Sequence, residues 1–285
     1  MDLCNISHIK ALLARHGFRF SKSMGQNFLI AGWVPQKIAV SSGADGNCGV
    51  LEIGPGIGVL TAQLAQRAGR VVAVELDKAL LPILAEALAS YDNVEILPGD
   101  VMKLDLAALA AEQFKGLTPI VCANLPYNIT TPVITALLEA GCFPSITVMI
   151  QREVAARICA RPGTSDYGAF SVFCQYHAAA EALFDVGPDC FLPAPKVTST
   201  VLRLVPRRTP PPEVENPDLF FRVVRASFAQ RRKTLLNSLA AAFGSAGKDQ
   251  LRQMIADCGL PDDVRGERLG IPEFAALARR IRSFF

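Results

Sequence analysis

Charged residues are scarce in this chain, and the features that would place it in several common classes of protein are missing. Only 19% of the 285 residues are charged, whereas 51% are apolar. The chain therefore has ample material for a buried core and does not read as intrinsically disordered. No uninterrupted apolar run reaches about 18 residues, so no membrane-spanning helix is expected. The first ten residues lack the basic-then-apolar layout of a signal peptide, which favours a cytoplasmic protein.

Residues that bind metals are either few or wrongly spaced. The three histidines, His8, His16 and His177, are scattered along the chain, and the eight cysteines include no CxxC pair, so the spacing of a zinc site is absent. Cysteines such as Cys122 and Cys174 lie within apolar runs, where cysteine acts as a small hydrophobic residue. We therefore expect reduced thiols and no metal.

The small positive charge is concentrated near the C-terminus. Residues 213–285 carry 12 of the 29 basic and 9 of the 26 acidic residues, so the remainder is balanced and the net charge of +3 arises there. Such a segment hints at a polyanionic partner.

Between residues 50 and 205, short apolar runs alternate with segments of helical periodicity. Continuously apolar strands joined by helices predict a parallel sheet covered on both faces, an α/β fold of the Rossmann-like kind. A final run at 197–205 alternates between apolar and polar residues, and we expect it to be an antiparallel edge strand. The strands expected before it are GVLEIG (49–54), RVVAVEL (70–76), NVEILPGD (93–100), TPIVCANL (118–125) and SITVMIQ (145–151).

Prolines then interrupt the pattern at residues 206–212, where neither a helix nor a central strand can continue. Everything beyond them has helical periodicity only. The sequence therefore predicts an α/β domain with an N-terminal arm over residues 1–205 and a small helical domain over residues 206–285. A monomer is expected, because no long amphipathic helix is left over for pairing.

A glycine cluster follows the first expected strand and opens a helix. Gly54, Gly56 and Gly58 allow a sharp turn and the close approach of a ligand to free N–H groups at a helix N-terminus. Glu75 ends the next strand, about 20 residues further on, where a carboxylate can accept both ribose hydroxyls. Asp100 follows the third strand and can either accept from an adenine amine or cap a helix. These residues predict a nucleoside cofactor.

The details of the glycine cluster bear on which cofactor it is. A dinucleotide site prefers Gly-x-Gly-x-x-Gly, and the third glycine position is Val59 here. This spacing, with Glu52 two residues ahead of the first glycine, favours S-adenosylmethionine over NAD.

The fourth strand ends in Asn124-Leu125-Pro126-Tyr127, which indicates the chemistry. The exocyclic amine of adenine is a poor nucleophile because its lone pair is delocalised into the ring. The Asn124 side-chain oxygen and a backbone carbonyl before or at Pro126 can accept its two hydrogens and free the lone pair to attack a methyl group. Tyr127 can stack on the target base. The motif predicts methylation of an amine.

Seven segments, in order, resemble the bacterial small-subunit ribosomal RNA adenine dimethyltransferase family. They are KSMGQNFL (22–29), EIGPGIGVLT (52–61), NLPYNI (124–129), QREVAARI (151–158), YGAFSV (167–172), FLPAPKVTSTV (191–201) and SFAQRRKTLLNSL (227–239). The resemblance implies a methyltransferase that uses S-adenosylmethionine to dimethylate two adjacent adenosines in the 3′-terminal hairpin loop of 16S rRNA, within the small ribosomal subunit.

The resemblance also implies roles for individual residues. The cofactor would be held by Asn27, Leu29, Gly54, Gly56, Gly58, Glu75, Asp100 and Asn124. The substrate adenine would be received at the catalytic residues Asn124, Leu125 (through its backbone), Pro126 and Tyr127, with Phe191 as a second aromatic wall. The candidate RNA contacts come from the charge pattern instead: the basic residues of a C-terminal helix either grip phosphates or form a solvated helix face. They are Arg222, Arg225, Arg231, Arg232 and Lys233.

Three alternatives remain at this level. A 23S rRNA adenine methyltransferase of the macrolide-resistance type would share the fold, the cofactor and an Asn–Pro–aromatic motif. A non-catalytic rRNA-binding assembly factor could retain the fold without turnover. An NAD-dependent oxidoreductase is disfavoured by Val59 and by the Asn124 motif.

Overall fold

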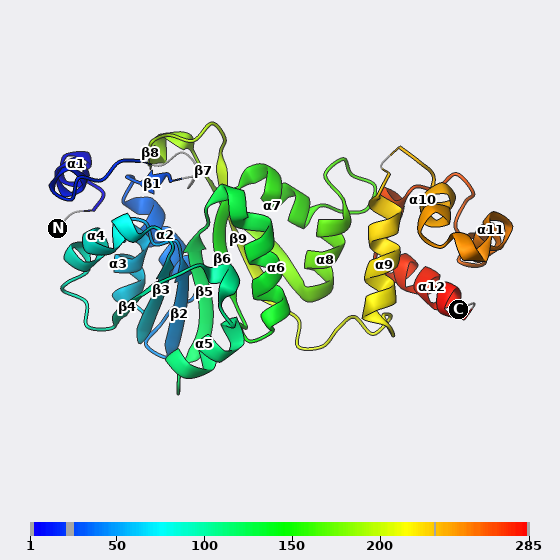
Figure 1. The fold of residues 1–285 in the computed structure, drawn as a ribbon, viewed down its shortest axis with the longest axis horizontal. Coiled ribbons are helices and arrows are strands. Elements are labelled where there is room, and N and C mark those ends of the chain that lie inside the picture. Colours follow the sequence, from blue (N-terminus) through cyan, green and yellow to red (C-terminus); the bar gives the residue numbers. More distant parts are fainter. Residues whose placement is uncertain (1–2, 21–25, 231, 284–285) are drawn as a thin grey trace. The chain divides into compact units, whose positions relative to one another are not determined.

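The computed structural model describes residues 3–20, 26–230 and 232–283. By their contacts, these residues group into two compact units (Figure 1). The first comprises Met1–Ala155 and Ala180–Pro206, and the second comprises Ala156–Ala179 and Arg207–Phe285. Among the helices formed by the described residues, none combines the length and apolar character needed to cross a bilayer.

Strands and helices alternate in the first unit as far as β6. The strands are β1 (Phe28–Leu29), β2 (Cys48–Ile53), β3 (Arg70–Glu75), β4 (Val94–Pro98), β5 (Thr118–Asn124), β6 (Ile146–Gln151), β7 (Ala178–Val186), β8 (Phe191–Leu192) and β9 (Ser199–Pro206). The helices are α1 (Ile6–Arg15), α2 (Trp33–Ser41), α3 (Val59–Ala65), α4 (Leu81–Ala87), α5 (Leu106–Gln113), α6 (Thr130–Ala140) and α7 (Arg152–Cys159), the last of which continues into the second unit.

The described strands form a seven-stranded sheet in the order β4-β3-β2-β5-β6-β9-β7. Neighbouring strands from β4 to β6 pair in parallel, and β9 pairs antiparallel to β6. Helices lie on both faces of the sheet (Figure 1). Every residue of β2 is buried, as expected for a strand inside a doubly covered parallel sheet. The Rossmann-like α/β fold expected from the sequence is confirmed.

Two features of the sheet differ from the expectation. The antiparallel strand β9 is not at the edge, because β7 lies outside it. The sequence predicts no strand over residues 178–186. That segment, AAAEALFDV, has an acidic residue at Glu181 and Asp185 and shows no clean alternation of burial. Both acidic side chains bond to β9, Asp185 to Thr200 and Glu181 to Arg203.

Among the described residues of the second unit, the helices after α7 are α8 (Ala169–His177), α9 (Pro217–Phe228), α10 (Leu235–Ala242), α11 (Lys248–Asp257) and α12 (Ile271–Arg282). Asn216 caps α9 by accepting from the Leu219 N–H at 3.0 Å, and Pro217 occupies the first turn, where its missing N–H costs nothing. The helical sequence therefore begins with a capped helix shortly after the proline-rich segment at 206–212.

The domain boundary at residues 205–206 stays a prediction; the units defined by contacts change at Pro206–Arg207. Residues 156–179 also group with the second unit. The reason is the aromatic packing of α8 on α9. The Tyr176 ring lies 5.6 Å from the ring of Phe220 and 4.9 Å from that of Phe221, so α8 shares a core with the C-terminal helices.

Gly49 in β2 provides a test of how tightly the sheet packs. A Cβ atom added there would lie 2.2 Å from Cδ1 of the buried Phe114. We expect Gly49→Ala to lower the free energy of unfolding by about 1–3 kcal/mol through overpacking. The matched control is Gly46→Ala, because nothing lies within 4 Å of that position. Equal denaturation midpoints for the two variants in urea would contradict this packing.

Candidate active site

The site lies where the direction of the strand order reverses. From β2 the chain proceeds outward through β3 to β4, and it then returns to the other side of β2 as β5. Ligands of open α/β sheets bind outside the carboxyl ends of the strands at such a point. A pocket lies there, and its lining includes β1 with the two residues before it and residues at the carboxyl ends of β2, β3, β4 and β5.

The structure brings most of the expected site residues to this one pocket. Those that line it are Asn27, Leu29, Gly54, Gly56, Glu75, Asp100, Asn124, Leu125, Pro126 and Tyr127. Two expected residues do not line it. Gly58 adopts a φ of 86° at the start of α3, where a Cβ would meet Leu88, so it shapes the helix start.

Phe191 is the second expected residue that lies elsewhere. Its side chain is only 3% exposed and belongs to the hydrophobic core of the first unit. It begins the short strand β8, which pairs with β1 through Leu29 and Phe28. In this structure Phe191 packs as a core residue, and its role beside a substrate base stays a prediction.

The glycine turn leaves room that side chains would fill. Gly54 and Gly56 have φ values of 68° and 62°, a region in which residues with a Cβ are strained. A Cβ at Gly56 would lie 3.2 Å from the ring of Phe28, and one at Gly54 would lie 3.4 Å from the ring of Pro126. The glycine turn and the Asn124–Tyr127 motif are therefore in direct contact.

Glu75 is held by the backbone of the pocket. Its Oε2 accepts from the Gly56 N–H at 3.3 Å, and its Oε1 accepts from the Asp77 N–H at 2.8 Å. Burial raises the pKa of Glu75, and the hydrogen bonds from Asp77 and Gly56 partly offset this. Each oxygen retains a lone pair for a hydroxyl of a ligand.

Asp100 caps a short helix and also lines the pocket. Its Oδ1 accepts from the Met102 N–H at 3.0 Å and caps a short 3-10 helix, η3 (Val101–Lys103). The carboxylate nevertheless lines the pocket, so its other oxygen is available to an amine.

Several pocket residues were not anticipated. Leu76 and Val101 directly follow Glu75 and Asp100 and supply apolar walls. The sequence did contain a signal for Leu76, because this leucine continues the apolar run of β3 beyond Glu75. Gln26 also lines the pocket, and its amide donates to Asp77 Oδ2 at 2.7 Å. Nothing in the sequence indicated that pairing.

Glu52 is the most unusual group in the pocket lining. It is only 1% exposed, and its Oε2 has no hydrogen-bond partner among the described residues. Burial raises the pKa of Glu52 to about 8, with a smaller contribution from the charge of Glu75; the nearby Thr61 hydroxyl acts in the opposite direction. An unpartnered carboxyl beside a pocket fits a site that receives a polar ligand.

The lining fits S-adenosylmethionine. Two carboxylates at the ends of β3 and β4 suit the hydroxyls and the amine of an adenosine, with Leu76 and Val101 to contact its ring. The side-chain-free turn at Gly54 and Gly56 suits the methionine part. Among the described residues, no group of three or more His, Cys, Asp or Glu side chains is arranged to hold a metal ion.

The basic residues predicted to bind RNA have a different local structure from the expected helix. The helix α9 ends at Phe228, and α10 begins at Leu235 because Thr234 caps it. Arg232 and Lys233 are exposed in the connection between these helices, and Arg231 lies outside the described residues.

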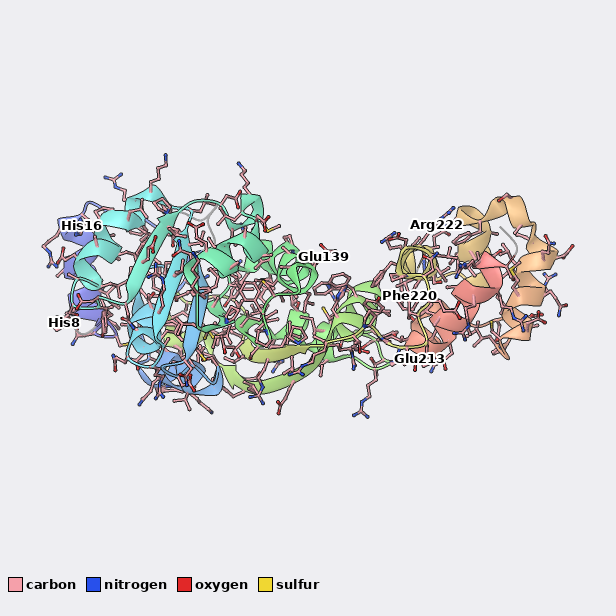
Figure 2. All side chains as sticks on the ribbon, turned by 90° about the horizontal axis from the view of Figure 1, so that it is seen from below. His8, His16, Glu139, Glu213, Phe220 and Arg222 are labelled. Atoms are coloured by element: carbon pink, nitrogen blue, oxygen red, sulfur yellow. The ribbon has the colours of Figure 1, made fainter. Side chains whose placement is uncertain are left out.

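Arg222 and Arg225 project from α9 and are both exposed; Figure 2 labels Arg222 on this helix. The guanidinium of Arg222 lies 4.5 Å from the centre of the Phe243 ring and donates to the Ala242 carbonyl oxygen at 3.2 Å. Arg222 therefore has a structural contact with the end of α10.

The fold and the pocket together define an α/β nucleoside-cofactor enzyme of the methyltransferase class. A family model described as ribosomal RNA adenine dimethylase matches residues 17–271. The chain belongs to this family. Family membership agrees with the enzyme class and with the expected cofactor, S-adenosylmethionine.

The chain is 48% identical over 288 residues to the ribosomal RNA small subunit methyltransferase A of Geobacillus thermodenitrificans, with 100% of this chain and 98% of that protein covered. Two solved structures are similar in fold. A dimethyladenosine transferase from Plasmodium falciparum has a TM-score of 0.73 at 23% identity, over 88% of this chain and 95% of that one. The 23S rRNA methyltransferase ErmE has a TM-score of 0.66 at 24% identity, over 90% and 100%.

The raised pKa of Glu52 predicts a dependence of stability on pH. Between about pH 4.5 and pH 8, the folded protein keeps a proton that the unfolded chain has lost. The free energy of unfolding therefore falls as pH rises through this window, by up to about 1.4 kcal/mol per unit from this group. The substitution Glu52→Gln removes this dependence on pH. The free energy of unfolding of Glu52→Gln minus that of the unsubstituted protein should therefore increase from pH 5 to pH 8.

The measurement is urea denaturation of the cofactor-free protein at several pH values. The control is Glu112→Gln at an exposed position on α5. The contribution of Glu75 is present in all three proteins and cancels in the difference. Parallel stability curves for the unsubstituted protein and Glu52→Gln would show that Glu52 titrates normally.

Proposed function

We propose that this protein transfers methyl groups from S-adenosylmethionine to the exocyclic amines of two adjacent adenosines in the 3′-terminal hairpin loop of 16S rRNA, within the small ribosomal subunit. The observation that carries the proposal is the meeting of Gly54, Glu75 and Asn124 at one pocket, with Tyr127 beside them. The choice of subunit is supported by curated relatives that are 45–48% identical and are named for the small subunit. The protein acts in the cytoplasm as a monomer, late in ribosome biogenesis.

The cofactor is held by groups from separate strand ends. Glu75 accepts from the ribose hydroxyls and Asp100 from the adenine amine, while the turn at Gly54 and Gly56 accommodates the methionine part. Asn27 and Leu29 close the site from the N-terminal side. When bound, S-adenosylmethionine supplies an electrophilic methyl group.

Asn124 and its neighbours prepare the amine of the substrate. The Pro126 carbonyl oxygen already accepts from the Ile129 N–H and the Thr130 hydroxyl, both at 3.2 Å. Of the two backbone carbonyls that could accept a hydrogen of the substrate amine, at Leu125 and at Pro126, that of Leu125 is therefore the better acceptor. The Asn124 side-chain oxygen and the Leu125 carbonyl each accept one hydrogen of the amine, which frees the nitrogen lone pair. The proton leaves after methyl transfer, so no strong base is required.

Recognition of the base relies on an unpaired loop and on stacking. Splaying out the bases of a hairpin loop costs little free energy. Tyr127 is one of the residues that line the pocket, and in this proposal its ring stacks on the adenine. In this proposal a basic surface in the second unit grips phosphates. Its described residues are Arg222, Arg225, Arg232 and Lys233; Arg231, which the sequence adds to the prediction, lies outside the described residues.

The proposal is tested by transfer of tritiated methyl groups from S-adenosylmethionine to unmethylated small subunits, followed by nucleoside analysis. Large subunits are the control. Dimethyladenosine on the small subunit alone is the expected result. Label on the large subunit would favour a macrolide-resistance type of enzyme, and binding to the small subunit without label would favour an assembly factor.

Two substitutions should separate binding from transfer. Asn124→Ala removes an acceptor for the amine, so methyl transfer should be abolished while the dissociation constant of S-adenosylhomocysteine changes little. Glu75→Ala removes the ribose acceptor and should raise that constant by about tenfold, the equivalent of a hydrogen bond to a charged group. Titration calorimetry and the methylation assay measure the two effects. Normal turnover by Asn124→Ala would exclude the proposed activation of the amine, and Glu112→Ala is the neutral control.

The basic surface is tested by charge reversal at Arg225, Arg232 and Lys233. Because these residues are proposed to neutralise phosphates, the triple glutamate variant should bind small subunits more weakly and show a shallower dependence of affinity on salt. Cofactor binding should be unaltered. An unchanged affinity and salt slope would remove these residues from the RNA interface.

A further inference from the structure

The segment 191–201 meets residues of the pocket lining at two places. At its start, Phe191 and Leu192 pair with Leu29 and Phe28, and further along the segment Ser199 approaches Tyr127. Its Oγ lies 2.7 Å from the hydroxyl oxygen of Tyr127, and Ser199 is fully buried, with 0% of its surface exposed. Tyr127 is one of the residues that line the pocket, and its hydroxyl is bonded to the first residue of β9.

The sheet holds Ser199 firmly. Ser199 is the first residue of β9 and pairs with Gln151, the last residue of β6. Immediately before it, the Thr198 carbonyl oxygen accepts from the Arg152 N–H at 3.0 Å, and immediately after it, the Thr200 hydroxyl donates to Asp185 on β7 at 2.6 Å. The start of β9 is thus bonded on both sides, which makes the Ser199 hydroxyl a fixed reference point.

Tyr127, by contrast, begins a single turn of 3-10 helix, η4 (Tyr127–Ile129). The hydroxyl lies at the far end of its ring, so a bond made there restricts both side-chain torsion angles. Burial raises the pKa of Tyr127, and the bond to Ser199 only partly offsets this. The pair is therefore a neutral hydroxyl–hydroxyl bond around neutral pH, and its strength does not depend on an ionised group.

We propose that Ser199 is a positioning residue for methyl transfer, because its hydrogen bond holds the Tyr127 ring at the angle at which the substrate adenine stacks. This inference rests on the proposed function and adds a residue to it. Ser199 acts through Tyr127 and touches neither the cofactor nor the reacting nitrogen.

The two methyl transfers should depend on this bond to different degrees. An unmethylated amine offers two hydrogens, one to Asn124 and one to the Leu125 carbonyl. After the first transfer only one N–H remains, so one of the two polar contacts that orient the base is lost. Stacking on Tyr127 then carries more of the orientation. Loss of the Ser199 bond therefore slows the second transfer more than the first, and monomethyladenosine accumulates.

The experiment is a double-mutant cycle. Ser199→Ala removes one hydroxyl, and Tyr127→Phe removes the other while keeping the aromatic ring. Each variant should lower kcat for the second transfer about 3- to 10-fold, as expected for one neutral hydrogen bond, with little change in the dissociation constant of S-adenosylhomocysteine. The double variant should be no slower than either single variant, because both remove the same bond.

Thr200→Val is the matched control. It breaks the neighbouring side-chain bond of β9, to Asp185, and leaves the Tyr127 pair intact. Its ratio of monomethyl- to dimethyladenosine should equal that of the unsubstituted protein. An unchanged product ratio in Ser199→Ala, additive losses in the double variant, or the same ratio in Thr200→Val as in Ser199→Ala would each overturn the proposal.

A second measurement separates this inference from the proposed function. Adenosine is titrated into protein saturated with S-adenosylhomocysteine, and its affinity is compared across the same four proteins of the cycle. If the unsubstituted protein fails to methylate small subunits but adenosine affinity falls in both single variants without further loss in the double variant, the proposed function fails and the positioning role stands. If methylation occurs and all four proteins match in adenosine affinity and product ratio, the positioning role is wrong and the function stands.

Discussion

Contact between two turns at adjacent strand ends is the constraint on which the site depends. The chain leaves β2 through Gly54 and leaves β5 through Asn124, and the two strands are neighbours in the sheet. The ring of Pro126 lies where a side chain on Gly54 would begin, at 3.4 Å from an added Cβ. A residue with a side chain at position 54 would have to adopt a strained φ, and its Cβ would lie in van der Waals contact with Pro126. Glycine at position 54 therefore lets the chain turn without strain where the cofactor side and the substrate side meet.

The charges around the pocket follow from the same crowding. Glu52 and Glu75 come from neighbouring strands, and burial makes both carboxyls harder to ionise. The protein stabilises Glu75 with backbone N–H groups from Gly56 and Asp77, whereas Glu52 has no such support on its Oε2. With Asp100 nearby in the lining, the pocket has an acidic character. Such a site suits a positively charged ligand such as a sulfonium compound and disfavours a pyrophosphate, in agreement with the choice that Val59 indicated from the sequence.

The parts of the structure that the sequence predicted best are those governed by local pattern. The inner strands β2, β3, β5 and β6 are continuous apolar runs that are buried over most of their length, and the pocket residues Gly54, Glu75 and Asn124 lie at the ends of three of them. The edge strand β4 is only partly buried, and Asp100 follows it. The parts that it did not predict depend on tertiary contacts. The strand at 178–186 has no alternating pattern that would distinguish it from a loop. Its acidic residues are accommodated by side-chain bonds to β9, which a local pattern does not reveal. Helix α9 ends at Phe228 although helix-forming residues follow, because Thr234 caps a new helix whose Leu235 N–H bonds to the Val264 carbonyl. Likewise, an aromatic residue such as Phe191 suits a core as well as a base, and only the fold decides between them.

The antiparallel direction of β9 explains how a residue from so late in the chain contributes to the edge that carries the site. Parallel strands present their carboxyl ends there, so a further parallel strand would offer only its last residues. An antiparallel strand reverses this, and its first residue, Ser199, lies beside the last residue of β6, Gln151. The segment before β9 begins at β8, which pairs with β1 next to the pocket residues Phe28 and Leu29. The stretch from β8 to Ser199 therefore supports the cofactor side of the pocket at one end and Tyr127 at the other. This explains why the segment 191–201 forms a long motif although few of its residues line the pocket.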